Sequence, residues 1–288
     1  MTTTGVLCMA YGSPRSEADV EAYFTDIRGG RPPAPEALAE LQGRYRAIGG
    51  SPLEAITRGQ AAALGERLGV PAFVGMKHSP PFIADGAAEA RAAGVERLVG
   101  LPLAPHFARM SVGQYETALR QAWPPDGQLS FVAGFHDHPA FVAAIVELLR
   151  EATADWQPER VFFTAHSLPC RVVEEGDPYD ERLLETCRLV ERQLPELPPW
   201  EFAFQSASHT GVPWLGPDLL DALERSRVRR ALVCPIGFVA DHLEVLYDID
   251  VEAQQWAAGH SVELRRTASF NDRPVFIEAL AEVVRPLL

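Results

Sequence analysis

The sequence has little of what marks a secreted, membrane-spanning or nucleic-acid-binding protein. Its 288 residues include only four cysteines, far apart and without a CxxC pair: Cys8, Cys170, Cys187 and Cys234. Such cysteines are typical of reduced thiols in a cytoplasmic protein. No apolar run is long enough to span a bilayer. The first residues contain no basic segment followed by an apolar one, so we expect no signal peptide.

Positive charge is also scarce. The chain has 26 Lys and Arg against 39 Asp and Glu, a formal net charge of −13. This excess of negative charge disfavours binding to nucleic acids and to anionic membranes. With 47% hydrophobic and 23% charged residues, the composition is that of an ordinary soluble protein. The length predicts one large domain or two small ones.

Several common catalytic signatures are missing. No GxGxxG follows an expected strand and no GxxxxGK[ST] occurs, so the sequence does not indicate a nucleotide site. The absence of GxSxG excludes the usual α/β-hydrolase nucleophile. HExxH and clustered Cys and His with zinc spacing are absent as well.

Short apolar runs alternate with longer amphipathic segments along the whole chain. Helical patterns include EALAELQGRYRAI and DERLLETCRLVERQL. The expected strands are GVLCMAYG, AFVGMKHS, VERLVGLPLAPHF, LSFVAGFH, RVFFTAHSLP, EFAFQSASH and RRALVCPIGF. Strands that alternate with helices predict parallel sheets with right-handed crossovers.

The two halves of the chain also resemble each other. Three stretches of the first half align, in order, with three of the second: GVLCMAYGSP with RVFFTAHSLP, VERLVGLPLAPHF with VRRALVCPIGFVADH, and FHDHPAFVAAIVELLR with FNDRPVFIEALAEVVR. We therefore predict two similar Rossmann-like α/β domains, residues 1–150 and 151–288, each a doubly wound parallel sheet, that face each other across a cleft. The last helix is expected to cross to the first domain.

The repeat indicates where a ligand would bind. Tyr11 and His166 occupy equivalent positions just past the first strand of each half. Ligands of open parallel sheets bind at the carboxyl ends of the strands. The second alignment also places the region of Glu244 at a strand end. We therefore expect Tyr11, His166 and Glu244 to share a cleft.

An acidic stretch, FVADHLEVLYDIDVEAQQW (238–256), contains no lysine or arginine. In a continuous helix, Glu244, Asp248 and Glu252 would lie one above another at i, i+4 and i+8, and Asp241 would join the same face. One interpretation is a solvated acidic face. The other is a path for a divalent cation, because imidazole and carboxylate ligands together suit first-row metals.

A second group of residues is basic. Arginine side chains bind carboxylates through two parallel hydrogen bonds. Together with nearby polar residues they predict a site for an anionic planar ligand, although ordinary surface arginines are the alternative. The group comprises Arg28, Arg31, Arg44 and Arg46, with Tyr45 and Ser51.

Taken together, these residues resemble the ferrochelatase family. The motifs, in family order, are AYGSP, RYRAIGGSPL, GMKHSPPF, PLAPHFARMSVGQY, TAHSLP, GDPY, QSASHTGVPWLGP and GFVADHLEVLYDID. The likeness is greatest to the soluble bacterial type that acts on coproporphyrin III. It implies a two-domain chelatase fold and insertion of Fe²⁺ into a porphyrin, with release of two protons, in haem biosynthesis.

The resemblance also implies residue roles. His166 and Glu244 are expected to be catalytic and to contact the metal on one face of the porphyrin. Tyr11 is expected on the opposite face, as an axial ligand of the product iron. Asp248 and Glu252 would form the metal path. The expected porphyrin contacts are Tyr11, Arg28, Arg44, Tyr45, Ser51 and Tyr115.

The same resemblance sets expectations about cofactors and partners. Fe²⁺ is a substrate. The carboxylates of the acidic stretch would also suit a regulatory or structural Mg²⁺. No other cofactor is expected to be tightly bound. No cysteine follows Cys234, so we expect no iron–sulfur cluster. A cytoplasmic monomer that passes its product to a haem-accepting enzyme is expected. The alternatives are a protoporphyrin IX ferrochelatase, a cobalt or nickel chelatase of the same fold, and a non-catalytic haem or metal carrier.

Overall fold

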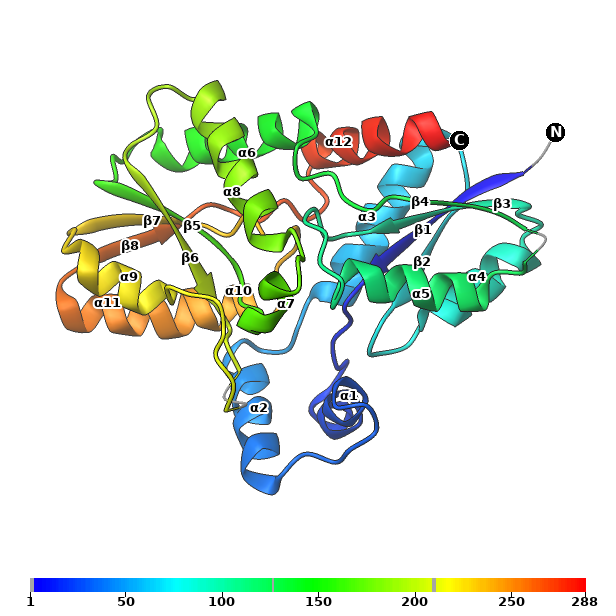
Figure 1. Cartoon of the computed structure of the whole chain (residues 1–288), viewed down its shortest axis with the longest axis horizontal. Coiled ribbons are helices and arrows are strands. Elements are labelled where there is room, and N and C mark those ends of the chain that lie inside the picture. Colours follow the sequence, from blue (N-terminus) through cyan, green and yellow to red (C-terminus); the bar gives the residue numbers. More distant parts are fainter. Residues whose placement is uncertain (1–2, 126, 209–210) are drawn as a thin grey trace.

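A computed structural model describes residues 3–125, 127–208 and 211–288. It contains two parallel four-stranded sheets, arranged side by side (Figure 1). The first has the order β2-β1-β3-β4, with β1 Thr4–Ala10, β2 Ala72–Met76, β3 Arg97–Pro102 and β4 Gln128–Phe131. The second has the order β6-β5-β7-β8, with β5 Arg160–His166, β6 Trp200–Gln205, β7 Arg230–Cys234 and β8 Glu263–Arg266. The identical strand orders confirm the predicted α/β fold class.

One strand, β8, was missed by the sequence analysis. Its residues, ELRR, are short and mostly charged, because β8 forms the edge of its sheet and pairs only with β7. A charged edge strand lacks the apolar pattern by which the other strands were recognised.

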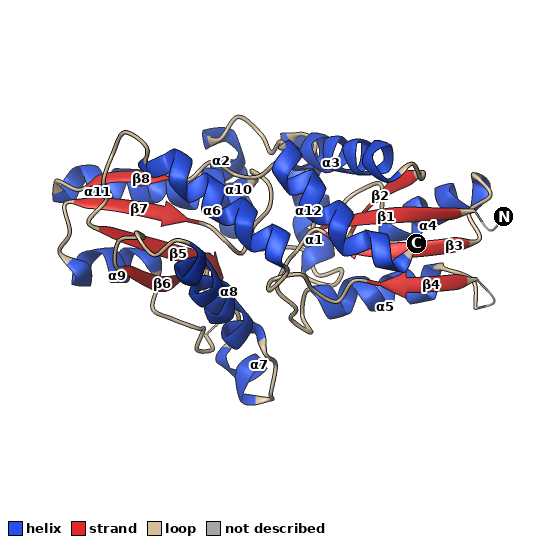
Figure 2. Cartoon of the chain, turned by 90° about the horizontal axis from the view of Figure 1, so that it is seen from above, coloured by secondary structure: helices blue, strands red, loops and turns tan. Residues whose placement is uncertain are grey.

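Helices cover both faces of each sheet (Figure 2). Those of the first half are α1 Val20–Ile27, α2 Pro35–Ala47, α3 Leu53–Leu68, α4 Ile83–Ala92, α5 Val112–Ala122 and α6 Pro139–Thr153. Those of the second half are α7 Cys170–Glu174, α8 Tyr179–Gln193, α9 Leu219–Ser226, α10 Leu243–Leu246, α11 Gln254–His260 and α12 Pro274–Val284. Three further short helices are η1 Glu17–Asp19, the π-helix η2 Asp248–Ala253 and η3 Arg285–Leu287.

Strand β1 shows why the central strands read as continuous apolar runs. Val6 and Cys8 point into a core shared with α3, whereas Leu7 and Met9 point into a second core shared with α4 and α5. All four side chains are fully buried. A parallel strand covered on both faces needs apolar residues at every position, not at alternate ones.

The helices that end each half exchange partners. Helix α12 packs against α3 of the first half, α6 packs against α8 of the second half, and α6 and α12 contact each other. Figure 1 shows α6 and α12 along one side of the molecule, above both sheets. One hydrophobic core therefore includes side chains from both sheets. Residue 150 lies inside α6, and the division into two domains remains a prediction.

Among the residues described, no helix combines the length and the apolar character that crossing a bilayer requires.

Candidate active site

The structure brings His166 and Glu244 together, as the repeat predicts. His166 is the last residue of β5, and Glu244 lies in the short helix α10. Their side chains are in direct contact, with 3.1 Å between His166 Nδ1 and Glu244 Oε2. About a third of each side chain is exposed, 32% and 29% respectively. A small charged molecule can therefore reach the pair from solvent.

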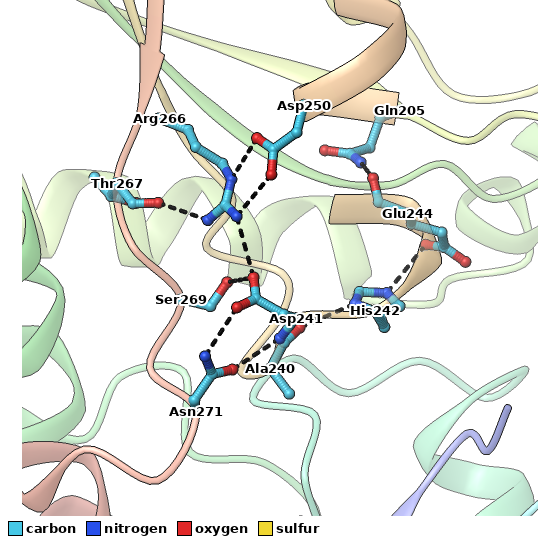
Figure 3. Close-up of polar contacts among 10 residues, drawn as sticks. All are labelled: Gln205, Ala240, Asp241, His242, Glu244, Asp250, Arg266, Thr267, Ser269 and Asn271. Atoms are coloured by element: carbon cyan, nitrogen blue, oxygen red, sulfur yellow. Dashed lines mark hydrogen bonds and ion pairs between the residues drawn. The ribbon is translucent and has the colours of Figure 1, made fainter. Parts of the chain in front are cut away.

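Three further residues hold this pair, and the sequence analysis did not single them out as site residues. The Gln205 amide donates a hydrogen bond of 2.8 Å to the Glu244 carbonyl oxygen (Figure 3). The Tyr179 hydroxyl donates one of 3.0 Å to the His166 carbonyl oxygen. His242 Nε2 lies 3.8 Å from Glu244 Oε2. Two histidines therefore face one carboxylate.

The two histidines and the carboxylate stabilise one another's charged forms. Burial alone would raise the pKa of Glu244, but the charges and hydrogen bonds of His166 and His242 outweigh it and hold that pKa well below its usual value. Burial likewise would lower the pKa of His166, but the Glu244 carboxylate raises it above its ordinary value. The contact therefore stabilises the protonated form of His166 and the ionised form of Glu244.

The acidic stretch differs from the predicted helix. His242 has an extended backbone, so the helix begins only at Leu243. From Asp248 to Ala253 the chain forms a π-helix, in which the Tyr247 carbonyl accepts from Glu252 N at 2.8 Å. The prediction of one continuous α-helix was therefore wrong. Residues four apart do not stack directly where hydrogen bonds span five residues, and such bulges are frequent at functional sites.

Asp241 is also not part of the acidic row. It precedes the helix, and its carboxylate accepts hydrogen bonds from Ser269, Asn271 and Arg266 (Figure 3). The prediction that it joins the same face was wrong. Its charge is compensated by residues more than 20 positions away, which a local sequence pattern does not show.

The remaining acids differ in exposure. Glu252 is exposed, whereas Asp248 is buried, with 7% of its surface accessible. The Ser206 hydroxyl donates a hydrogen bond to Asp248, and Arg44 Nη1 lies 3.9 Å from Asp248 Oδ1. Burial, with a contribution from the Glu244 charge, raises the pKa of Asp248 to about 7. Glu252 is therefore open to solvent, whereas Asp248 is buried and close enough to Glu244 for their charges to interact.

Tyr11 directly follows β1 and is 38% exposed. Its ring contacts that of His78, with centroids 4.5 Å apart. Burial of the hydroxyl raises the pKa of Tyr11, and the Glu244 charge raises it further. The same charge contributes to the raised pKa values of Tyr45 and Tyr115. These tyrosines therefore lie within electrostatic reach of Glu244.

Lys77, the only lysine in the sequence, was not predicted as a site residue. Its ammonium group lies 5.4 Å from the centre of the Tyr11 ring and 5.9 Å from that of Tyr115. Burial lowers the pKa of Lys77 to about 8, although the charge of Asp26 acts in the opposite direction. The sequence signal that could have identified it is its place in the family-like motif GMKHSPPF.

Two of the predicted porphyrin contacts are arginines. Arg28 is exposed at the end of α1, and its guanidinium lies over the Phe24 ring. Arg44 pairs with Glu40 at 2.8 Å and lies over the Tyr247 ring at 5.0 Å. These arginines therefore contact residues of the protein itself.

Tyr45 and Ser51, which were also predicted to contact the porphyrin, have contacts within the protein. Tyr45 is 6% exposed and packs edge-on against Tyr23, with centroids 6.3 Å apart. The Ser51 hydroxyl accepts a hydrogen bond of 3.3 Å from the backbone N–H of Leu53, the first residue of α3. Tyr45 lies within α2, and Ser51 lies in the loop just before α3. His209 and Thr210 of the motif QSASHTGVPWLGP lie outside the described residues.

The model of one protein family, described as Ferrochelatase, matches residues 3–287 of the chain. The chain belongs to the ferrochelatase family. A ferrochelatase from Herpetosiphon aurantiacus is 38% identical, over 98% of both chains. A coproporphyrin III ferrochelatase from Geobacillus is also 38% identical, over 97% of this chain and 96% of that protein. Membership in the family assigns the chain to haem biosynthesis.

Solved structures agree with the fold. SirB from Bacillus subtilis, determined with Fe³⁺, has a TM-score of 0.64 at 13% identity and covers 99% of this chain and 95% of its own. CbiX, described as the terminal enzyme of sirohaem biosynthesis in denitrifying bacteria, has a TM-score of 0.58 at 17% identity, over 99% of both chains. At these identities the comparison supports the chelatase fold alone.

Proposed function

We propose that the protein is a coproporphyrin ferrochelatase. It inserts Fe²⁺ into coproporphyrin III and releases the two protons of the pyrrole N–H groups. The observation that carries this proposal is the contact between His166 and Glu244 at the end of β5, with Tyr11 at the equivalent end of β1. Relatives named coproporphyrin III ferrochelatases, from Geobacillus and Halalkalibacterium halodurans, support the choice of substrate.

His166 and Glu244 are the catalytic pair in this proposal. Fe²⁺ approaches past Glu252 and Asp248 and reaches the oxygen of Glu244. As the metal enters the ring, two pyrrole N–H protons leave, and a nearby base accelerates that loss. The Glu244 carboxylate is such a base, and His166 becomes one once its imidazolium has released its own proton. The metal replaces the two protons charge for charge, so the reaction requires no oxidant or reductant.

Tyr11 and the arginines take the other parts of the reaction. Tyr11 is the axial ligand of the product iron, on the face opposite His166. Arg28 and Arg44, with Tyr45, Ser51 and Tyr115, contact the porphyrin, and the arginines bind its carboxylates. Binding energy from those carboxylates can offset the cost of distorting the ring, which exposes the nitrogen lone pairs.

Anaerobic insertion of Fe²⁺, followed by absorbance, tests the proposal with coproporphyrin III and protoporphyrin IX in parallel. Faster turnover of coproporphyrin III is expected. Faster turnover of protoporphyrin IX would refute the assigned substrate while leaving the family intact. Turnover of neither porphyrin would favour a carrier, and turnover with Co²⁺ or Ni²⁺ alone would favour a chelatase for another metal.

A variant tests the catalytic pair. His166→Ala is expected to lose insertion activity by at least about 100-fold, because general acid–base catalysis typically contributes that much or more. Porphyrin binding, measured by fluorescence quenching, should remain. His260→Ala is the matched control, since His260 is exposed and its described contacts are a hydrogen bond to the Trp256 carbonyl and stacking on the Trp256 ring. Retained turnover in His166→Ala would contradict the assigned role.

A further inference from the structure

The acidic segment that carries Glu244, residues 241–250, begins and ends with an aspartate. Arg266, the last residue of β8, contacts both Asp241 and Asp250 (Figure 3). Its Nε lies 2.7 Å from Asp250 Oδ1 and its Nη2 lies 2.8 Å from Asp250 Oδ2, so this pair is bidentate. The same Nη2 lies 3.2 Å from Asp241 Oδ1. Bidentate pairs of arginine and carboxylate fix direction as well as distance. One guanidinium therefore holds both carboxylates.

The Asp241 end is additionally fixed to the loop that follows β8. The Ser269 hydroxyl donates to Asp241 at 2.7 Å, and the Asn271 amide donates to it at 2.9 Å. In return the backbone N–H of Asp241 donates to Asn271 Oδ1 at 2.9 Å. Asn271 has a φ of 48°, which asparagine tolerates better than most residues. This end of the segment is anchored by three side chains, those of Arg266, Ser269 and Asn271.

Between the two anchored ends lie Glu244 and Asp248. The intervening structure consists of a four-residue helix, α10, followed by the first turn of the π-helix. Helical segments this short do not hold their shape without outside contacts. Apolar packing fixes the inner side, where Val245 and Ile249 are fully buried. Arg266 is the side chain that makes polar contacts with both Asp241 and Asp250.

We propose that Arg266 is a positioning residue for metal insertion. It holds Asp241 and Asp250 at a fixed separation and thereby places Glu244 against His166 and Asp248 behind it. The inference rests on the proposed function, because only a reaction at Glu244 gives that placement a catalytic consequence. Arg266 itself contacts neither substrate. The porphyrin contacts proposed above come from other elements, so porphyrin affinity should not depend on it.

The decisive comparison is Arg266→Gln against Arg265→Gln. Arg265 is the adjacent residue, but its guanidinium pairs with Glu263 at 3.0 Å and stacks on Trp156, away from the acidic segment. We expect Arg266→Gln to lower kcat for Fe²⁺ insertion by about tenfold or more, as misplacement of catalytic groups by about 1 Å can cost 100-fold. The Kd for coproporphyrin III should change by less than about twofold, and Arg265→Gln should retain the native kcat.

Two milder variants separate positioning from folding. Arg266→Lys keeps the positive charge but cannot make the two parallel hydrogen bonds to Asp250, so it should have an intermediate kcat. Asp250→Asn releases only one end and should lower kcat with little change in Tm. Native kcat in Arg266→Gln and Asp250→Asn would overturn the inference while leaving the proposed function intact. A parallel loss of kcat, porphyrin affinity and Tm in all three variants would also overturn it, because that pattern indicates a purely structural role. An inactive native protein would refute the proposed function instead.

Discussion

Replacing Asp248 with asparagine should stabilise the protein, and more at alkaline than at acidic pH. The carboxylate of Asp248 is buried, and its pKa rises from an ordinary value of 3.8 to about 7. Keeping this group ionised in the folded protein therefore costs about 4 kcal/mol, at 1.36 kcal/mol for each pKa unit. Asparagine resembles the protonated acid, carries no charge and can still accept the Ser206 hydrogen bond.

The sign follows from proton binding. Between about pH 4 and pH 7 the folded protein holds a proton on Asp248 that the unfolded chain has released, so the free energy of unfolding falls as pH rises through that window. The gain from Asp248→Asn should be about 2 kcal/mol at about pH 5.5 and about 4 kcal/mol at about pH 8. Below about pH 4 the gain should disappear.

Urea unfolding of both proteins at the two pH values measures the effect. The native protein should lose about 2 kcal/mol of stability between them that the variant keeps. Glu252→Gln is the matched control, because Glu252 is exposed and a change there should be nearly neutral. An equal difference in stability at both pH values would refute the raised pKa of Asp248. A loss of stability would show that the carboxylate is needed in its ionised form.

Two further variants test other parts of the site. Tyr11→Phe should retain the insertion rate within about threefold, well above the rate of His166→Ala. Its air-oxidised product complex should lose the absorbance of a phenolate–iron ligand. An unchanged spectrum would contradict the axial role of Tyr11. Gly237→Ala should lower the free energy of unfolding by about 1–3 kcal/mol, because the added Cβ would lie 2.5 Å from that of Ala165. Since Ala165 precedes His166, the insertion rate should fall as well. A native Tm would show that β5 can shift to accommodate the added methyl group without loss of stability.

Much of the fold could be predicted because it is repeated. The alignment of Tyr11 with His166 required only the two apolar runs that precede them, and both runs form the central strands β1 and β5. Parallel strands covered on both faces have an unmistakable apolar pattern. The second alignment, of VERLVGLPLAPHF with VRRALVCPIGFVADH, placed Glu244 at a strand end, where it contacts His166.

The polar details could not be predicted, because they depend on residues distant in sequence. Asp241 is compensated by Arg266 and Asn271, 25 and 30 positions later. The π-helix at Asp248 has no signature in a pattern of charges. Tyr45 is apolar enough to pack against Tyr23, and only the tertiary structure shows that it is buried. Sequence periodicity indicates which face of a helix or strand is apolar. It does not indicate which residues distant in sequence will form hydrogen bonds or packing contacts with that element.

The exchange of terminal helices has a consequence for folding. Helix α6 completes the core of the second half, and α12 completes that of the first. A fragment cut near residue 150 would therefore expose the apolar surface of α3 that α12 covers, or that of α8 that α6 covers. The two halves should therefore melt together in a single cooperative transition, and they should refold only as one chain.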